Sequence, residues 1–255
     1  MFSDACQPSD YDRFKPFFSK ALAAYHGVPE GAVHTNDWGL AGEEPLDLAL
    51  LGLPVLSMRV RVGRNLAAFP LPADLTQEQR CALELRMCKA FDKLISMPEY
   101  GGQYISITPG HENEVTVEEY TTLVDAHIMF KDMSADPYLL SAGIAADWPH
   151  GRGCYISEDR GFVVWVGEED HLRIMCMQTG SVLNTVFDRL KTALDVIGSA
   201  ELGLEFATSP DFGVVTSCEA PAQKSPIRTS DLTTTFRHHF FTLVLSNIPS
   251  KIFYL

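Results

Sequence analysis

The sequence predicts an α+β protein in which helices pack against an antiparallel β-sheet. Residues 162–166 form a continuously apolar run, and residues 172–177 fit a second strand whose faces alternate along the chain. The polar residues 167–171 between them are few enough for a hairpin turn. Apolar residues recur at helical spacing over 182–197, in a separate stretch. Hairpins and helices in separate stretches favour an antiparallel sheet over repeated β-α-β units.

Further stretches supply the remaining elements. Apolar residues at three- and four-residue spacing predict helices over 11–25 and 76–94, and Thr76 can cap the second one. Residues 54–62 alternate in character, so one face of this strand should be buried. A short strand is expected over 213–217. Together with the hairpin, these elements describe one α+β domain.

Composition defines a folded, acidic chain. Its 255 residues are enough for one large domain or two small ones, and 46% of them are hydrophobic, which supports a substantial core. The 20 basic residues are outnumbered by 33 acidic ones, for a net charge of −13. This negative field argues against sequence-independent binding of nucleic acid and against docking on an acidic membrane, although a pocket can still focus a local positive potential.

Localisation is suggested by features that the sequence lacks. It has no run of about 18 apolar residues that could span a membrane, and its start shows no basic region followed by an apolar stretch. The 6 cysteines have no C-x-x-C spacing, so we expect reduced thiols, mainly buried. These features predict a cytoplasmic protein without a membrane partner.

Two arginines on one predicted strand are the first candidates for chemistry. Arg59 and Arg61 project from the same face of strand 54–62, about 6.6 Å apart. Like charges at that spacing are unfavourable unless an anion lies between them, and guanidinium groups bind phosphate oxygens through paired hydrogen bonds. The alternative is a solvated face of an edge strand, with the arginine side chains extended into water.

An acidic turn is the second candidate. Glu168, Glu169 and Asp170 are consecutive, and a polar turn tolerates their repulsion by exposing them to water. Alternatively, these carboxylates could hold Mg²⁺ through water and clamp a cationic guanidinium, since Mg²⁺ prefers oxygen ligands and keeps several waters. Arg173 follows on the next strand, so opposite charges could converge there.

A histidine and a cysteine are weaker candidates. His127 precedes an apolar stretch, where a lone histidine is usually an ordinary surface or core residue. Cys218 follows the predicted strand 213–217, where a thiol could be partly exposed, although a buried cysteine is the ordinary case.

Four segments in order resemble one known family. The segments are VLSMRVRVGRNL (55–66), DAHIMFK (125–131), LLSAGIAADWPHGRG (139–153) and FVVWVGEEDHLRIMCM (162–177). They are similar to the phosphagen kinases, the creatine and arginine kinase group of ATP:guanidino phosphotransferases, and the resemblance runs from about Tyr11 to Cys218. It implies a guanidino kinase catalytic domain with an antiparallel sheet and flanking helices, preceded by the end of a small all-α N-terminal domain.

The resemblance also implies an activity and its cofactors. Phosphagen kinases move the γ-phosphoryl group reversibly between Mg·ATP and a small guanidino substrate, so ATP or ADP and Mg²⁺ are expected. The residues that would contact the nucleotide are Ser57, Arg59, Arg61, Arg173 and, against the adenine, His127. Glu169 would bind the guanidinium and could act as base, with Glu168, Glu169 and Asp170 ordering the water shell of Mg²⁺. Cys218 fits the reactive cysteine beside the guanidino substrate.

The chain departs from the family at both ends. Residues 1–45 correspond to a remnant of the helical domain and a Gly- and Pro-rich linker, residues 46–218 to a partial catalytic domain, and residues 219–255 to a divergent tail. The family's later strands and its remaining phosphate-binding arginine are missing, and the surroundings of Arg228 do not match. We therefore expect an unpaired sheet edge and a weak or lost activity.

Two alternatives stay open at this point. One is an inactive homologue that binds nucleotide or a partner, associating with itself or with an intact family member, and pairing of the tail with the sheet would favour it. Residues 240–245 already have the apolar character of a strand. The other is a protein-arginine kinase, which the creatine-kinase-like segment 139–153 disfavours.

Overall fold

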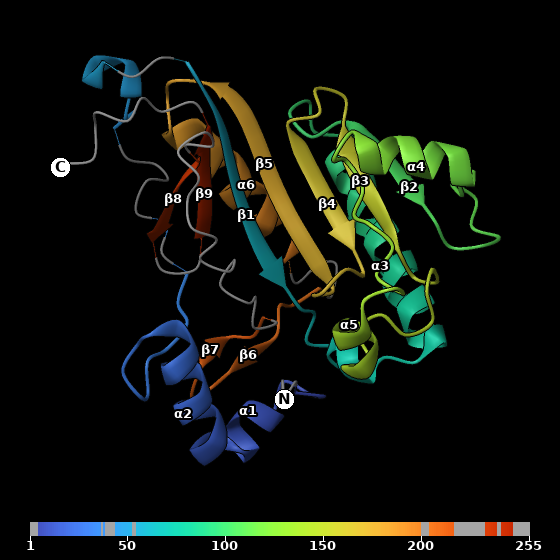
Figure 1. Cartoon of the computed structure of the whole chain (residues 1–255). Helices are drawn as coiled ribbons and strands as arrows, with labels where there is room; N and C mark the ends of the chain where they lie inside the picture. The colour runs from blue at the N-terminus through green and yellow to red at the C-terminus, as the bar shows by residue number, and fades with distance from the viewer. Residues whose placement is uncertain are drawn as a thin grey trace.

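A seven-stranded antiparallel sheet forms the centre of the molecule (Figure 1). The computed structural model describes residues 5–36, 38, 44–52, 55–199 and 204–216, and the backbone of 233–238 and 241–246. The strands, in sheet order, are β2 (Gly102–Ser106), β3 (Gly153–Ser157), β4 (Phe162–Val166), β5 (Leu172–Gly180), β1 (Leu56–Arg64), β9 (Phe241–Ser246) and β8 (Thr233–His238). The predicted α+β fold with an antiparallel sheet is confirmed.

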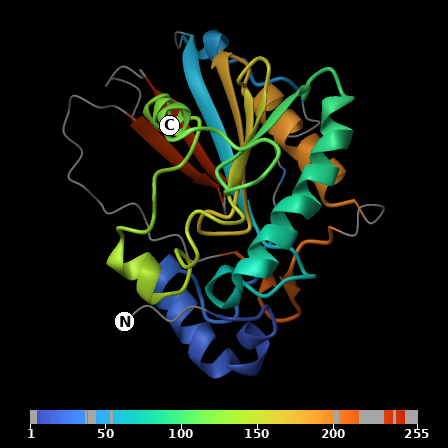
Figure 2. The ribbon, with the colours of Figure 1, turned by 90° about the vertical axis from the view of Figure 1, so that its right-hand side faces the viewer.

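Helices cover both faces of the sheet. On one face lie α3 (Gln77–Ile95) and α6 (Asn184–Ile197), and α4 (Val117–Asp125) and α5 (Pro137–Ser141) lie on the other side (Figure 2). Each face has its own apolar core, the larger one under α3 and α6 and the smaller one beside β2, β3 and β4. Among the described residues, no helix is both long and apolar enough to cross a membrane.

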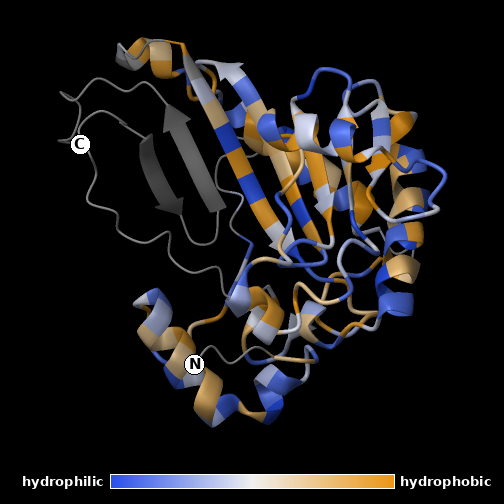
Figure 3. Cartoon of the chain, turned by 45° about the vertical axis from the view of Figure 1, so that its right-hand side comes forward, coloured by the Kyte–Doolittle hydropathy of each residue, from blue (hydrophilic) through white to orange (hydrophobic). Residues whose placement is uncertain are grey.

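Strand β1 has the alternation that its sequence predicts. Met58, Val60 and Val62 are 0%, 0% and 3% exposed and belong to the larger core. Arg59 and Arg61 lie on the opposite face and are half-buried. Stripes of hydrophobic and hydrophilic residues along β1 show this division (Figure 3). The strand therefore presents its arginines to the face away from α3 and α6.

The predicted helix over 76–94 is confirmed as α3. Thr76 is its N-cap, and its hydroxyl oxygen accepts a hydrogen bond from Gln79 N at 3.3 Å, while Gln79 Oε1 accepts from Thr76 N at 2.9 Å. This reciprocal pair satisfies two backbone donors that a helix start leaves free. The helix buries its apolar face, including Met87 and Phe91, under the sheet.

The expected single helix over 11–25 is two helices, α1 (Asp10–Arg13) and α2 (Lys15–His26). Pro16 explains the break, because it has no backbone N–H to bond the carbonyl four residues earlier, and proline is accepted only in the first turn of a helix. The pair packs against the two-stranded ribbon of β6 (Thr208–Ser209) and β7 (Gly213–Val214) (Figure 1).

Other details correct the sequence prediction. Two 3₁₀ elements that the sequence did not predict, Leu48–Leu51 and Pro72–Asp74, lie between α2 and α3 along the chain. The strand expected over 213–217 is only the two residues of β7, and Ser217 lies outside the described residues. The five described cysteines are free thiols as expected, but only Cys154 and Cys176 are buried.

We expected the missing family strands to leave an unpaired sheet edge, and this expectation is wrong for β1. Residues 57–61 of β1 pair with β9, in a register that sets Arg59 opposite Val244 and Arg61 opposite Thr242. Strand β9, close to the predicted strand 240–245, pairs in turn with β8. The reason is composition: β8 has three threonines and a phenylalanine, and β9 has a phenylalanine, a threonine and a valine, all residue types that favour extended backbone. The edge of the sheet on this side is thus β8, and β2 is the opposite edge.

Candidate active site

The three predicted phosphate-binding arginines lie on one face of two adjacent strands. In the antiparallel ladder Arg61 is opposite Met175, and Arg173 is opposite Gly63. Arg61 and Arg173 are therefore diagonal neighbours, about 7–8 Å apart along the sheet surface. Arg59 lies one step further along β1 and faces Met177. We call Arg59, Arg61 and Arg173 the arginine strip.

Ser57 lies at the outer end of the same face. It is opposite Thr179 on β5 and Ser246 on β9, and it is exposed. It shares the face of the arginine strip because residues two apart on a strand point the same way. A hydroxyl there can donate to a phosphate oxygen bound along the strip.

Arg173 joins the arginine strip to the acidic turn. Its Nε donates to Glu168 Oε2 at 2.6 Å, and its Nη2 donates to Glu169 Oε2 at 3.1 Å. Arg173 is 5% exposed, whereas the carboxylate side chains are 14% and 34% exposed, so the pairs lie at the rim of the sheet face. The predicted convergence of opposite charges is present. In this structure both carboxylates bond the guanidinium of Arg173.

The acidic turn is a closed hairpin connection. Gly167 N donates to His171 O at 2.9 Å, and β4 and β5 pair on either side of it. Arg152 Nε donates to Gly167 O at 3.0 Å and so fixes the start of the turn from below. These bonds hold the backbone of Glu168 and Glu169 in one place.

Asp170 has different surroundings from its two neighbours. It is 3% exposed, and its Oδ1 accepts a hydrogen bond from Asn65 Nδ2 at 2.6 Å. A Cβ at Gly63 would overlap Asp170 Oδ2, so glycine leaves the space that this carboxylate fills. The interpretation of all three carboxylates as solvated turn residues is therefore wrong for Asp170.

His171 anchors the end of the turn. Its Nδ1 accepts from Leu66 N at 2.9 Å, so its Nε2 carries the proton that bonds Pro70 O at 2.8 Å. Burial lowers the pKa of His171 to about 4, so the ring is neutral at pH 7. The residue directs the acidic turn without taking part in its charge balance.

His127 lies in a segment that is bonded to β4, the strand next to the one that carries Arg173. It is exposed, with a positive φ of 57°, and follows α4. The carbonyl of the next residue, Ile128, accepts a hydrogen bond from Trp165 Nε1 at 2.6 Å. Trp165 is directly opposite Arg173. The segment that carries His127 is therefore tied to the row of Arg173, while Cys218 lies outside the described residues.

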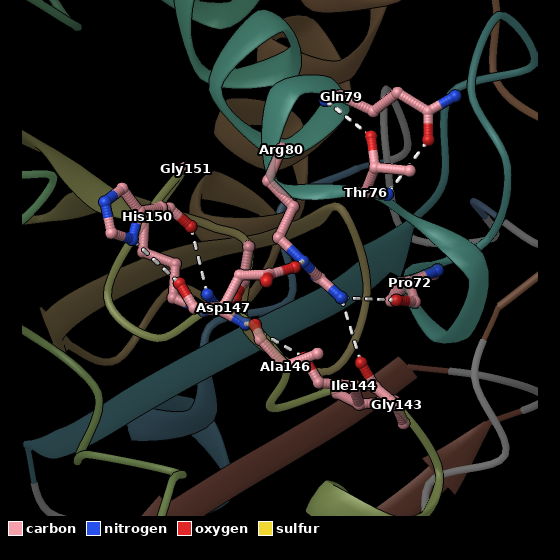
Figure 4. Close-up of polar contacts among 12 residues, drawn as sticks. Pro72, Thr76, Gln79, Arg80, Gly143, Ile144, Ala146, Asp147, His150 and Gly151 are labelled. Atoms are coloured by element: carbon pink, nitrogen blue, oxygen red, sulfur yellow. Dashed lines mark hydrogen bonds and ion pairs between the residues drawn. The ribbon is translucent and has the colours of Figure 1, made fainter.

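A second polar cluster surrounds Arg80 at the start of α3 (Figure 4). Arg80 on α3 donates through Nη2 to Pro72 O and to Gly143 O, both at 2.9 Å. Arg152 is fully buried, and burial lowers its pKa to about 10. These arginines bond backbone carbonyls of the 143–152 segment and its neighbours, so their role is structural.

Sequence reasoning missed Asn65, His171 and Trp165, which place the predicted residues. Asn65 and His171 stand inside the segments that resemble the family, but nothing in their spacing marked them. Their importance depends on contacts between residues about 105 positions apart, such as Asn65 with Asp170.

The site residues fit Mg·nucleotide chemistry. The arginine strip offers charged donors for phosphates, and the part-exposed Glu168 and Glu169 offer the oxygen ligands that Mg²⁺ prefers. Within the described part of the chain, no group of three or more His, Cys, Asp or Glu side chains is arranged to hold a metal directly. A metal held through water and substrate phosphates needs no such group.

Comparison with known proteins identifies the family of the chain. Residues 83–221, more than half of the chain, match the model of the ATP:guanido phosphotransferase C-terminal catalytic domain. The chain therefore belongs to the ATP:guanido phosphotransferase family, the phosphagen kinases.

Individual relatives are similar over most of the chain. It is 35% identical over 217 residues to taurocyamine kinase from Schistosoma mansoni, covering 84% of this chain and 28% of that protein. It is 33% identical to arginine kinase from Haliotis madaka, covering 84% of this chain and 57% of that protein. The solved structure of the substrate-free duplicated taurocyamine kinase from Schistosoma mansoni matches 83% of this chain and 29% of that one, with TM-score 0.70 and 34% identity. The chain spans less than two thirds of each.

Proposed function

We propose that this chain binds Mg·ATP and transfers its γ-phosphoryl group reversibly to a guanidino nitrogen of a small substrate. The observation that supports the proposal is the arginine strip, which ends at Glu168 and Glu169. Phosphoryl transfer depends mainly on positioning and charge neutralisation, which charged donors supply without covalent chemistry.

The arginine strip would bind the phosphates of ATP or ADP. Guanidinium groups two residues apart on β1 can each make paired hydrogen bonds to one polyphosphate, which also relieves their repulsion. Arg173 would break its bonds to Glu168 and Glu169 and bind the same polyphosphate as Arg59 and Arg61. Ser57 would contribute a hydroxyl, and His127 would lie against the adenine.

Glu168 and Glu169 would help to hold Mg²⁺ through its water shell. Bound there, Mg²⁺ would supply neutralisation of the phosphate charge that develops during transfer. Asp170 would act less directly than Glu168 and Glu169, because it is buried and bonds Asn65. Its contribution would be to fix the turn and to keep the local field negative.

Glu169 would also bind the guanidino substrate and accept its proton. A guanidinium nitrogen becomes nucleophilic as it loses a proton, and a carboxylate within hydrogen-bond reach can take that proton during attack. Cys218, as a thiolate stabilised by the cationic substrate, would tune this step.

The rate should be lower than that of a whole relative. Residues after 218 offer no phosphate-binding arginine in the family's context, and one lost preorganised contact costs about 10²–10³ in rate. The test is to follow phosphoguanidine formation by ³¹P NMR with creatine, arginine and taurocyamine in turn. One product that disappears in Glu169→Gln, but persists in the exposed control Glu158→Gln, supports the proposal. ATP bound without any product contradicts it.

A binding role without transfer is the second candidate. The pairing of β9 with β1 supports it, because the tail then occupies the edge of the sheet that carries the arginine strip. Such a chain would bind Mg·ADP or a partner, including a second copy or an intact family member. Mg·ADP binding with no phosphoguanidine in the NMR experiment would favour this candidate.

A further inference from the structure

Asn65, the residue directly after β1, connects three segments of the chain. It is 1% exposed. Its Nδ2 donates to Asp170 Oδ1 at 2.6 Å and to Val215 O at 3.3 Å, and its Oδ1 accepts from His171 N at 2.9 Å. One side chain therefore joins the end of β1, the acidic turn and the segment that runs to residue 216.

An asparagine suits this position for a chemical reason. A carboxamide has one acceptor and two donor hydrogens in a single plane, which is the combination these three partners need. An aspartate would set a second carboxylate against Asp170 and an acceptor against Val215 O. A leucine would leave a buried carboxylate without its donor, which is costly.

The bonds of Asn65 set the position of the acidic turn. Asp170 bonds Asn65 and fills the space that Gly63 leaves by having no side chain. It also lies near Arg64: burial lowers the pKa of Arg64 to about 10, and the negative charge of Asp170 opposes that shift. With Asp170 and His171 fixed, the preceding Glu168 and Glu169 have little freedom except in their side chains. Their distance from Arg173 depends on this anchor.

The backbone of Asn65 adds a link to the same segment. Its carbonyl accepts a hydrogen bond from Ala207 N at 2.7 Å, and Ala207 O accepts from Val215 N at 3.1 Å. Val215 is therefore held twice, through its own N–H and through its carbonyl. Two residues of a site built on different segments keep their spacing only when such links are rigid.

We infer that Asn65 is a positioning residue that holds the acidic turn in register with the segment leading towards Cys218. It thereby sets how well Glu168 and Glu169 support Mg²⁺ at the arginine strip. The inference rests on the proposed function, because it assigns Asn65 a role in the Mg²⁺ side of that same site. Asn65 touches neither nucleotide nor metal, so its effect should be confined to the contribution of Mg²⁺.

The test compares ADP binding by calorimetry in the presence of Mg²⁺ and in EDTA. In Asn65→Ala, the gain in affinity from Mg²⁺ should fall about tenfold, the size expected when a partner of a metal-supporting carboxylate is removed. ADP affinity in EDTA should not fall, because the arginine strip is retained. Asn65→Ser, a milder change, should give a smaller loss in the same direction if the alanine variant does not fold.

Asn184→Ala is the matched control. Asn184 is also a buried asparagine, 3% exposed, and joins two chain segments through Leu46 N at 2.7 Å and Glu44 O at 3.3 Å. It should lower the melting temperature as Asn65→Ala does, without changing the Mg²⁺ gain. A wild-type gain that survives in both Asn65 variants would overturn the positioning role alone. No Mg²⁺-dependent ADP binding by the wild-type chain would overturn the proposed function, and the positioning role with it.

Discussion

Replacing Glu168 by glutamine should change nucleotide affinity in opposite directions with and without Mg²⁺. Glu168 accepts a 2.6 Å hydrogen bond from Arg173 Nε, so a phosphate must displace it to reach the guanidinium. A hydrogen bond to a charged group contributes about 1.5–3 kcal/mol, and about 1.4 kcal/mol corresponds to tenfold in affinity. Because the Glu168 side chain is 14% exposed and water screens it in part, we take the lower end. In EDTA, Glu168→Gln should bind ADP about tenfold more tightly.

With Mg²⁺ present the sign should reverse. The carboxylate then supports the water shell of the metal, and losing such support costs about 10- to 100-fold in metal affinity. Calorimetric titration of ADP in EDTA and in saturating Mg²⁺ measures both arms. Glu158→Gln, an exposed carboxylate on the turn between β3 and β4, controls for net charge. The same direction of change in both solutions would refute the reasoning that Glu168 alternates between Arg173 and the metal.

Three further predictions concern stability. Gly63→Ala should lower the free energy of unfolding by about 1–3 kcal/mol, because its Cβ would overlap Asp170; Gly101→Ala, where a Cβ has ordinary contacts, should change it far less in the same urea titration. The pKa of His171 falls from 6.5 to about 4 on folding, so as pH falls the unfolded state takes up the proton before the folded state does. The free energy of unfolding should therefore drop by about 3 kcal/mol between pH 6.5 and pH 4. His171→Gln should reduce this pH dependence in urea titrations, and an unchanged pH dependence would contradict the assignment. Deleting 219–255 should expose the edge of β1 and cause self-association at micromolar concentration in size-exclusion chromatography, whereas a monomeric truncated chain would show that β9 is not needed to cover it.

Patterns local to one strand or turn were sufficient to predict the face of the site. Alternation along β1 placed Arg59 and Arg61 on the face away from the larger core, because a strand has a strict period of two. The short turn between two apolar runs predicted that Arg173 would meet the acidic residues, and it bonds Glu168 and Glu169. Both inferences needed only neighbours within a few residues.

Features that depend on distant contacts were not predictable in the same way. The burial of Asp170 depends on Asn65 and on the missing side chain of Gly63, about 105 residues earlier in the chain. The strand that pairs with β1 is β9, and it lies in a tail that does not resemble the family. Because the family's own later strands are missing, the sequence predicted that β1 would be left unpaired. Pro16 marks the break between α1 and α2, but the apolar residues keep helical spacing across it and so predicted one continuous helix.

The central claim is that the phosphate site is assembled within this chain, on β1 and β5. Calorimetry of Mg·ATP with the wild-type chain and with Arg173→Ala tests it most directly. The account predicts that the wild type binds and that the variant binds more weakly by about 1.5–3 kcal/mol, the contribution of a hydrogen bond to a charged group. Equal binding by both proteins, or no binding by the wild type, would contradict it.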